Sequence, residues 1–74
     1  LLGLAPVLQE RLLKAIKKIN EERGTAILIA EQYVVPTIDI VDRGYVIETG
    51  VITVSGSKEE LLNNPQVRAA YLGI

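Results

Sequence analysis

The chain has 74 residues, a net charge of −1 from 8 basic and 9 acidic side chains, and neither cysteine nor histidine. This composition excludes disulfides, thiolate metal sites and a histidine general base, and the charge balance gives no electrostatic case for binding nucleic acid. A chain this short buries only about 60% of its unfolded surface, yet 49% of its residues are hydrophobic. We interpret the excess as surface that something else covers; a compact, well-packed mini-domain is the alternative.

The opening stretch Leu1 to Pro6 has no basic region and no long apolar run, so it does not resemble a signal peptide. No apolar run in the sequence reaches the length of a membrane span. The lack of an initiator methionine fits a fragment, and the lack of cysteine and of a signal fits a cytoplasmic protein.

The first predicted helix begins at Pro6, because a missing N–H is harmless at the first helical position, and ends before Gly24, a typical cap glycine. Apolar residues recur at helical spacing and form one stripe, opposite a charged face. The stripe consists of Leu8, Leu12, Ile16 and Ile19, and the charged face of Arg11, Lys14, Lys18 and Glu22. We interpret that face as a solvated surface, balanced by Glu10, Glu21 and Glu22, in preference to a site for an anionic partner.

Residues Thr25 to Ala30 form an unbroken apolar run that does not alternate with polar residues. A short, continuous run rich in β-branched residues is typical of a strand buried on both faces, as in a parallel sheet. Such burial requires helices on both sides and neighbouring strands, which this chain has too few elements to supply. The run therefore predicts partners outside these residues.

After the predicted strand, Pro36 is expected to open a short helix that ends at about Val41. Strands Gly44 to Glu48 and Val51 to Ser55 then flank Thr49-Gly50, a hairpin signal. Ser57 and Glu60 form a capping box for a helix Lys58 to Asn63, and a last helix is capped by Asn64, begins at Pro65 and ends at Gly73. The predicted order of helix, strand, helix, hairpin, helix and helix indicates an α/β chain forming a single partial domain over residues 1–74.

The sequence contains no Gly-rich phosphate loop followed by Lys-Ser or Lys-Thr, and no nucleophile beside a base. Asp39 and Asp42 could share a helix face, but we favour capping or a salt bridge with Arg43 over metal binding. The best-placed polar pair is Glu31-Gln32, because ligands of open α/β sheets bind beyond the carboxyl ends of the strands. The Gln32 amide could hold a phosphate oxygen or an attacking water; the alternative is that both residues only solvate the strand end.

Leu2-Gly3-Leu4-Ala5-Pro6 resembles the D-loop of ABC-transporter ATP-binding subunits, in the Gly-Leu-Ala-Pro form typical of the branched-chain amino-acid type. Thr25 to Gln32 resembles the strand leading to the switch region, or H-loop, of that family. Asp42 to Gly50 is similar to its Asp-Arg-Gly-Tyr-Val-Leu-Glu-Thr-Gly hairpin. Glu59 to Leu62 and Val67 to Gly73 resemble its C-terminal helices, so the resemblance spans essentially the whole chain in order.

The resemblance implies the C-terminal part of a P-loop NTPase domain, from the D-loop onward, in a cytoplasmic subunit held at the inner membrane by permease subunits. In the intact parent, ATP and Mg²⁺ would lie between two head-to-tail ATP-binding subunits, and ATP hydrolysis would drive the import of branched-chain amino acids. The resemblance carries over a D-loop and dimer contact at Leu2, Gly3, Leu4 and Ala5, and a switch position at Gln32. Most of the family has His at that position, and the branched-chain subgroup often has Glu-Gln.

The Walker A loop, the signature motif and the Walker B acids of the family would all precede Leu1. We therefore expect the 74 residues alone to need no cofactor, to bind no metal and to be inactive as an ATPase. A second hypothesis is a stand-alone small α/β protein-interaction module that forms a homo-oligomer by pairing Ala26 to Ala30 with a second copy.

Overall fold

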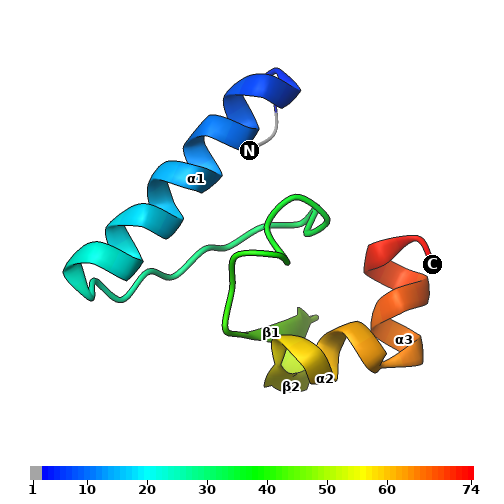
Figure 1. Ribbon diagram of the computed structural model, residues 1–74. Coiled ribbons are helices and arrows are strands. Elements are labelled where there is room, and N and C mark those ends of the chain that lie inside the picture. The colour runs from blue at the N-terminus through cyan, green and yellow to red at the C-terminus, as the bar shows by residue number, and fades with distance from the viewer. Residues whose placement is uncertain (1–2) are drawn as a thin grey trace. The chain divides into compact units, whose positions relative to one another are not determined.

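The computed structural model describes residues 3–74. The chain divides into a first compact unit, Leu1–Ile40, and a second, Val41–Ile74. The elements in chain order are α1 (Pro6–Arg23), β1 (Arg43–Glu48), β2 (Val51–Ser57), α2 (Lys58–Asn63), α3 (Pro65–Val67) and the π-helix η1 (Arg68–Leu72) (Figure 1). Within residues 3–74, no helix is long and apolar enough to cross a membrane.

Helix α1 begins and ends where the sequence predicts. Pro6 is its first residue, and Gly24 caps it with φ 64° and an N–H that donates to the Asn20 carbonyl at 3.0 Å. The buried side of the helix differs from the predicted stripe, because Leu13 is 7% exposed while most of the stripe faces solvent. The exposed members of the stripe are Leu8, Leu12 and Ile19. Helix α1 therefore presents an uncovered apolar face.

The prediction of a strand over Thr25 to Ala30 is wrong for this structure. The segment has no regular secondary structure, and Leu28 in its middle is 93% exposed. The physical reason is that a strand exists through hydrogen bonds to a neighbouring strand, and the sheet found among residues 3–74 consists of β1 and β2 alone. The apolar run has the composition of a buried strand without the neighbours that would pair with it.

The short helix predicted from Pro36 to about Val41 is also wrong, because residues 35–40 form hydrogen-bonded turns. The Val34 carbonyl accepts from the Thr37 and Ile38 N–H groups at 3.0 and 2.9 Å, and from the Thr37 hydroxyl at 3.0 Å. Thr37 is buried. The Thr37 hydroxyl thus donates to the same Val34 carbonyl as the two N–H groups of the turn. Local hydrogen bonds of this kind, from a side chain to the backbone, compete with a regular helix.

Strands β1 and β2 pair antiparallel around Thr49-Gly50, which confirms the predicted hairpin. Thr49 has φ 51° and Gly50 has φ 75°. Positive φ at both central residues is the signature of a type I′ turn, whose twist matches that of the flanking strands. The turn therefore sets the register in which the two strands pair.

Strand β2 carries a bulge. Val46 pairs with Val54, whereas the next residue of β1, Ile47, pairs with Ile52, so that Thr53 is the extra residue between them. Val46 and Val54 are half-buried, and Ile47 and Ile52 are exposed.

Helix α2 packs closely on the hairpin because glycines lie beneath it. Gly44 and Gly56 are partners in the sheet register. A Cβ atom on Gly44 would come within 2.8 Å of Leu61 Cδ1, and one on Gly56 within 3.1 Å of Glu60 Cβ. Leu61 and Val67 are 5% and 4% exposed and form the core of the second unit.

The predicted helix caps of the second unit are confirmed. Ser57 Oγ accepts from the Glu60 N–H at 3.1 Å, and Glu60 Oε1 accepts from the Ser57 N–H at 3.1 Å, which completes the capping box. Asn64 Oδ1 accepts from the N–H groups of Gln66 and Val67 at 2.9 and 3.1 Å. Each side chain satisfies backbone donors that the first turn of its helix leaves unpaired.

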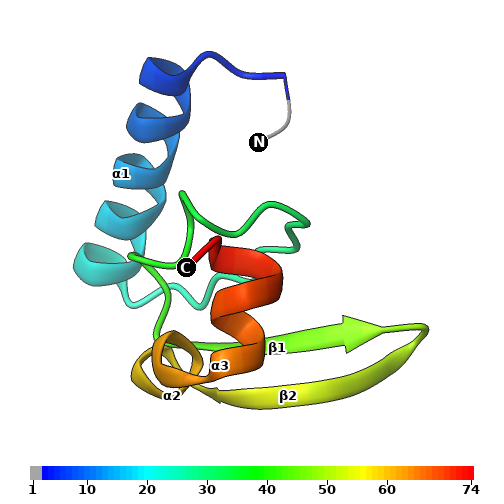
Figure 2. The ribbon, with the colours of Figure 1, turned by 90° about the vertical axis from the view of Figure 1, so that its right-hand side faces the viewer.

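The last helix ends at Gly73 as predicted, but its second half is wider than an α-helix. Residues Arg68–Leu72 form the π-helix η1, which the N–H of Gly73 closes by donating to the Arg68 carbonyl. Figure 2 shows α3, with the helical ribbon that follows it, above the plane of the hairpin.

Candidate functional site

The segment that resembles a D-loop lies directly before α1. Its Leu2 falls outside the described residues; Gly3 has φ 87° and Leu4 is exposed. The Ala5 carbonyl accepts from the N–H groups of Leu8 and Gln9 at 2.9 and 3.0 Å, and the Gln9 amide donates to the Leu4 carbonyl at 2.9 Å. Residues at the start of α1 therefore donate hydrogen bonds to the carbonyls of Leu4 and Ala5, while residues 3–5 remain exposed.

The pair Glu31-Gln32 follows the apolar segment. Glu31 is half-buried and makes a polar interaction, and Gln32 is exposed at a bend. A neutral amide in this position can donate and accept hydrogen bonds but cannot act as a general base. The geometry allows Gln32 to meet a ligand from solvent, and its catalytic role stays a prediction.

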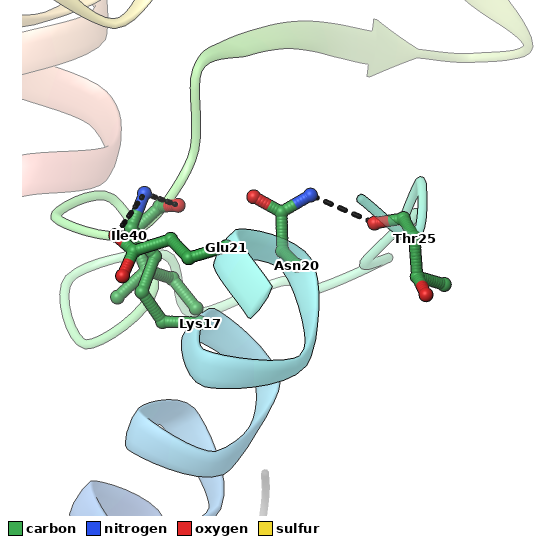
Figure 3. A network of polar contacts seen from close by, with 5 residues as sticks. All are labelled: Lys17, Asn20, Glu21, Thr25 and Ile40. Atoms are coloured by element: carbon green, nitrogen blue, oxygen red, sulfur yellow. Dashed lines mark hydrogen bonds and ion pairs between the residues drawn. The ribbon is translucent and has the colours of Figure 1, made fainter. Parts of the chain in front are cut away.

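Figure 3 shows a polar network at the end of α1. The Lys17 ammonium lies 3.7 Å from Glu21 Oε1 and donates to the Ile40 carbonyl at 3.5 Å, while the Asn20 amide donates to the Thr25 carbonyl at 2.7 Å. These bonds fasten the chain beyond α1 back onto the helix. We assign them a structural role; the signal in the sequence is the Lys-Glu spacing of four residues between Lys17 and Glu21.

The acidic side chains give no metal centre among residues 3–74, since no group of three or more His, Cys, Asp or Glu is placed to hold an ion. Asp42, at the beginning of the hairpin, serves through its backbone: its carbonyl accepts from the Lys58 N–H at 3.0 Å. That bond links the entry to β1 with the start of α2. Asp39 makes a polar interaction as well.

Sequence reasoning missed one side-chain pair in the second unit. The Tyr71 hydroxyl on η1 donates to Glu48 Oε1 at the end of β1, at 3.0 Å. This hydrogen bond is the largest cause that raises the pKa of Tyr71 above its ordinary 10.0, and loss of water and the charge of Glu48 act in the same direction. Both residues line a cavity between the hairpin and the last helices.

Comparison with known proteins identifies relatives over almost the whole chain, although no protein-family model matches. The high-affinity branched-chain amino acid transport ATP-binding protein BraG of Pseudomonas aeruginosa is 38% identical over 72 residues, 97% of this chain. The corresponding protein LivG of Escherichia coli is 35% identical over 71 residues, 96% of this chain. The lipopolysaccharide export system ATP-binding protein LptB of Haemophilus influenzae is 32% identical over 71 residues, also 96% of this chain.

The chain spans only a part of each relative: 30% of BraG, 28% of LivG and 29% of LptB. All three carry the words ATP-binding protein in their names; BraG and LivG are named for branched-chain amino acid transport, and LptB for lipopolysaccharide export. The chain is therefore homologous, over almost its full length, to part of the ATP-binding proteins of ABC transporters.

Proposed function

We propose that these residues form the C-terminal part of the ATP-binding domain of an ABC importer, from the D-loop onward, and that the parent protein couples ATP hydrolysis to transport. The observation that carries this proposal is the collinear similarity to such ATP-binding proteins over 97% of the chain. The single partial domain predicted over residues 1–74 is part of the same proposal.

The uncovered apolar surface of the first unit supports this reading. Leu28 is almost fully exposed in a run with the composition of a buried strand, and α1 presents Leu8, Leu12 and Ile19 to solvent. Leaving the Leu28 side chain in water forgoes about 1.5–3 kcal/mol, and each half-exposed side chain of α1 forgoes a part of that amount. The rest of an ATP-binding domain would supply the neighbouring strands and helices that recover this free energy.

Branched-chain amino acids are the transported substrates that we propose. Two of the relatives described above, BraG and LivG, are named for branched-chain amino acid transport, at 38% and 35% identity. LptB, at 32% identity, is named for lipopolysaccharide export. The Gly-Leu-Ala-Pro and Asp-Arg-Gly-Tyr-Val-Ile-Glu-Thr-Gly stretches favour the first assignment.

In the parent we propose that ATP and Mg²⁺ bind between two ATP-binding subunits, with Gln32 at the switch position and Leu2 to Ala5 at the subunit contact. Membrane permease subunits would be the further partners, which places the parent in the cytoplasm at the inner membrane. The exposure of Gln32 and of residues 3–5 is consistent with these contacts.

A chimera tests the proposal. The segment of BraG that aligns with this chain is replaced by the matching residues of this chain, and ATP hydrolysis is measured on the purified protein. We expect a folded chimera with ATPase activity within about tenfold of BraG, and a loss of about tenfold or more on Gln32→Ala. Asn63→Ala, which removes an exposed amide on α2, is the matched control and should leave the rate unchanged. A folded chimera that binds ATP without hydrolysing it would contradict the proposal.

The isolated chain is proposed to be inactive. Its sequence lacks the Gly-rich loop that cradles phosphates, and no group of three or more acidic side chains within residues 3–74 is placed to hold Mg²⁺, so millimolar ATP should not shift its thermal unfolding. Sedimentation separates this proposal from the alternative of a stand-alone interaction module. A stable, well-folded dimer would favour the module, whereas a poorly folded or aggregating monomer favours part of a larger domain.

A further inference from the structure

A cavity of about 260 Å³ lies within the second unit, between the hairpin and the helices α3 and η1. Its lining combines aliphatic and polar residues. The aliphatic residues are Val46, Val54, Val67 and Ala70, and the polar ones are Glu48, Thr53, Gln66 and Tyr71. Among these lining residues, Glu48 is the one whose side chain is charged at neutral pH. The lining thus combines four aliphatic residues with a single negative charge.

Two irregular elements meet at this cavity. Thr53 is the bulge residue of β2, and Ala70 and Tyr71 belong to the π-helix η1. Bulges and π-helical turns both redirect side chains, and both are over-represented beside functional sites. Each of these elements interrupts the regular backbone hydrogen-bond pattern of its strand or helix. Here both elements contribute residues to the lining of the same cavity.

The carboxylate of Glu48 is positioned by Tyr71, whose hydroxyl donates to Oε1 at 3.0 Å. A carboxylate can accept about four hydrogen bonds through its two oxygens, so this one retains acceptor capacity toward the cavity. The cationic residue of η1, Arg68, is engaged elsewhere: it donates to the Leu62 carbonyl at 3.2 Å and is not among the lining residues.

We propose that this cavity binds a small primary ammonium ion with a branched aliphatic tail. The ammonium group would donate a charge-assisted hydrogen bond to Glu48, and the Thr53 hydroxyl and Gln66 amide oxygen would accept its remaining protons. The tail would lie against Val46 and Val54 and remove their apolar surface from water. This site lies within the second unit and does not depend on the proposed transporter function.

The test is an NMR titration of the isotope-labelled 74-residue chain with 3-methylbutylammonium at constant ionic strength. Saturable shifts are expected at Glu48, Thr53 and Tyr71, with a dissociation constant of about 1–10 mM for a ligand of this size. The neutral isostere 3-methylbutanol should bind about tenfold more weakly, because it lacks the charge. Glu48→Gln keeps an acceptor for Tyr71 but should weaken ammonium binding about tenfold. Glu59→Gln, an exposed carboxylate on α2 outside the lining, should not change it.

Equal binding of the alcohol and the ammonium, or unchanged binding in Glu48→Gln, would overturn the proposal. So would the absence of saturable shifts in a chain that shows the cross-strand contacts of the hairpin. The same titration on the BraG chimera decides the case if the isolated chain lacks the cross-strand contacts of the hairpin. Lysine side chains carry the same ammonium chemistry, so Nα-acetyl-lysine methylamide is the third probe. Tighter binding of that probe than of the free amine would overturn the assignment to a small amine.

Discussion

The hydroxyl of Tyr71 and the carboxylate of Glu48 join the last helical segment to the end of the first strand, across 23 residues of sequence. The bond spans the second unit from η1 to β1. The bond links the position of the C-terminal helix to that of the hairpin. Because the Tyr71 hydroxyl titrates, the pKa of Tyr71 reports whether the bond is formed.

We expect the Tyr71–Glu48 bond to be lost at high pH. Because the pKa of Tyr71 is raised above 10.0 in the folded chain, its stabilising effect is fully present below about pH 10 and disappears as the pH rises through the raised value. In a Tyr33→Phe, Tyr45→Phe background, absorbance at 295 nm reports Tyr71 alone, since the chain has 3 tyrosines. Glu48→Ala, which removes the acceptor, should lower the pKa of Tyr71 toward 10.0; an unchanged pKa of Tyr71 would show that the bond does not form.

Gly44→Ala should destabilise the second unit. The added Cβ would meet Leu61 Cδ1 at 2.8 Å, and Leu61 is buried, so its side chain has little room to move. Urea denaturation should show a loss of about 1–3 kcal/mol in the free energy of unfolding, the usual range for overpacking. Combining Gly44→Ala with Leu61→Val should cost less than the sum of the two single changes. Strict additivity would mean that the two side chains do not compete for space.

Asn64→Ala should weaken the last helix. Its side-chain oxygen accepts from two backbone N–H groups, those of Gln66 and Val67, and loss of such a cap costs about 0.5–2 kcal/mol. Far-UV circular dichroism during denaturation follows the effect. Asn63→Ala, at the adjacent exposed position, supplies the comparison and should change stability by less than about 0.5 kcal/mol. Equal effects of the two substitutions would argue against the cap.

Leu28→Lys should leave the melting temperature of the isolated chain unchanged and reduce its aggregation. Leu28 is 93% exposed, so a charged side chain there displaces no packing. Leu13→Lys is the contrasting variant and should destabilise α1, because Leu13 is buried. In the BraG chimera we expect Leu28→Lys to lower the yield of folded protein, because that context would bury the segment as a strand. A chimera that tolerates it fully would contradict the proposed sheet.

Features that depend on a few neighbouring residues could be predicted from the sequence. Pro6 and Gly24 bound α1, Ser57 and Glu60 cap α2, and Thr49-Gly50 forms the hairpin turn. Each of these rests on the conformational preference of one residue or on a side-chain bond within three positions, so no distant part of the chain is needed to satisfy it.

Features that depend on distant partners could not be predicted. The run Thr25 to Ala30 has strand composition, but pairing is supplied by a neighbour and not by composition. The burial of Leu13 in place of the predicted stripe depends on what packs against α1. The Tyr71–Glu48 bond is equally non-local. For the candidate site, the family resemblance predicted Gln32 and residues 2–5. The ATP chemistry proposed for them also requires the Walker A, signature and Walker B motifs, which these 74 residues do not contain.

The extra residue in β2 has a genetic consequence. Side chains along a strand point alternately to its two faces, so Ile52 and Val54 would share a face in a regular strand. Thr53 is what allows Ile52 to be exposed opposite Ile47 while Val54 is half-buried opposite Val46. An in-frame deletion of that single codon would make Ile52 the direct neighbour of Val54, and regular alternation would still place the two side chains on opposite faces, opposite Ile47 and Val46. Such a deletion would therefore remove the bulge and keep the pairing, whereas a deletion of Ile52 itself would shift the register of the residues next to the turn.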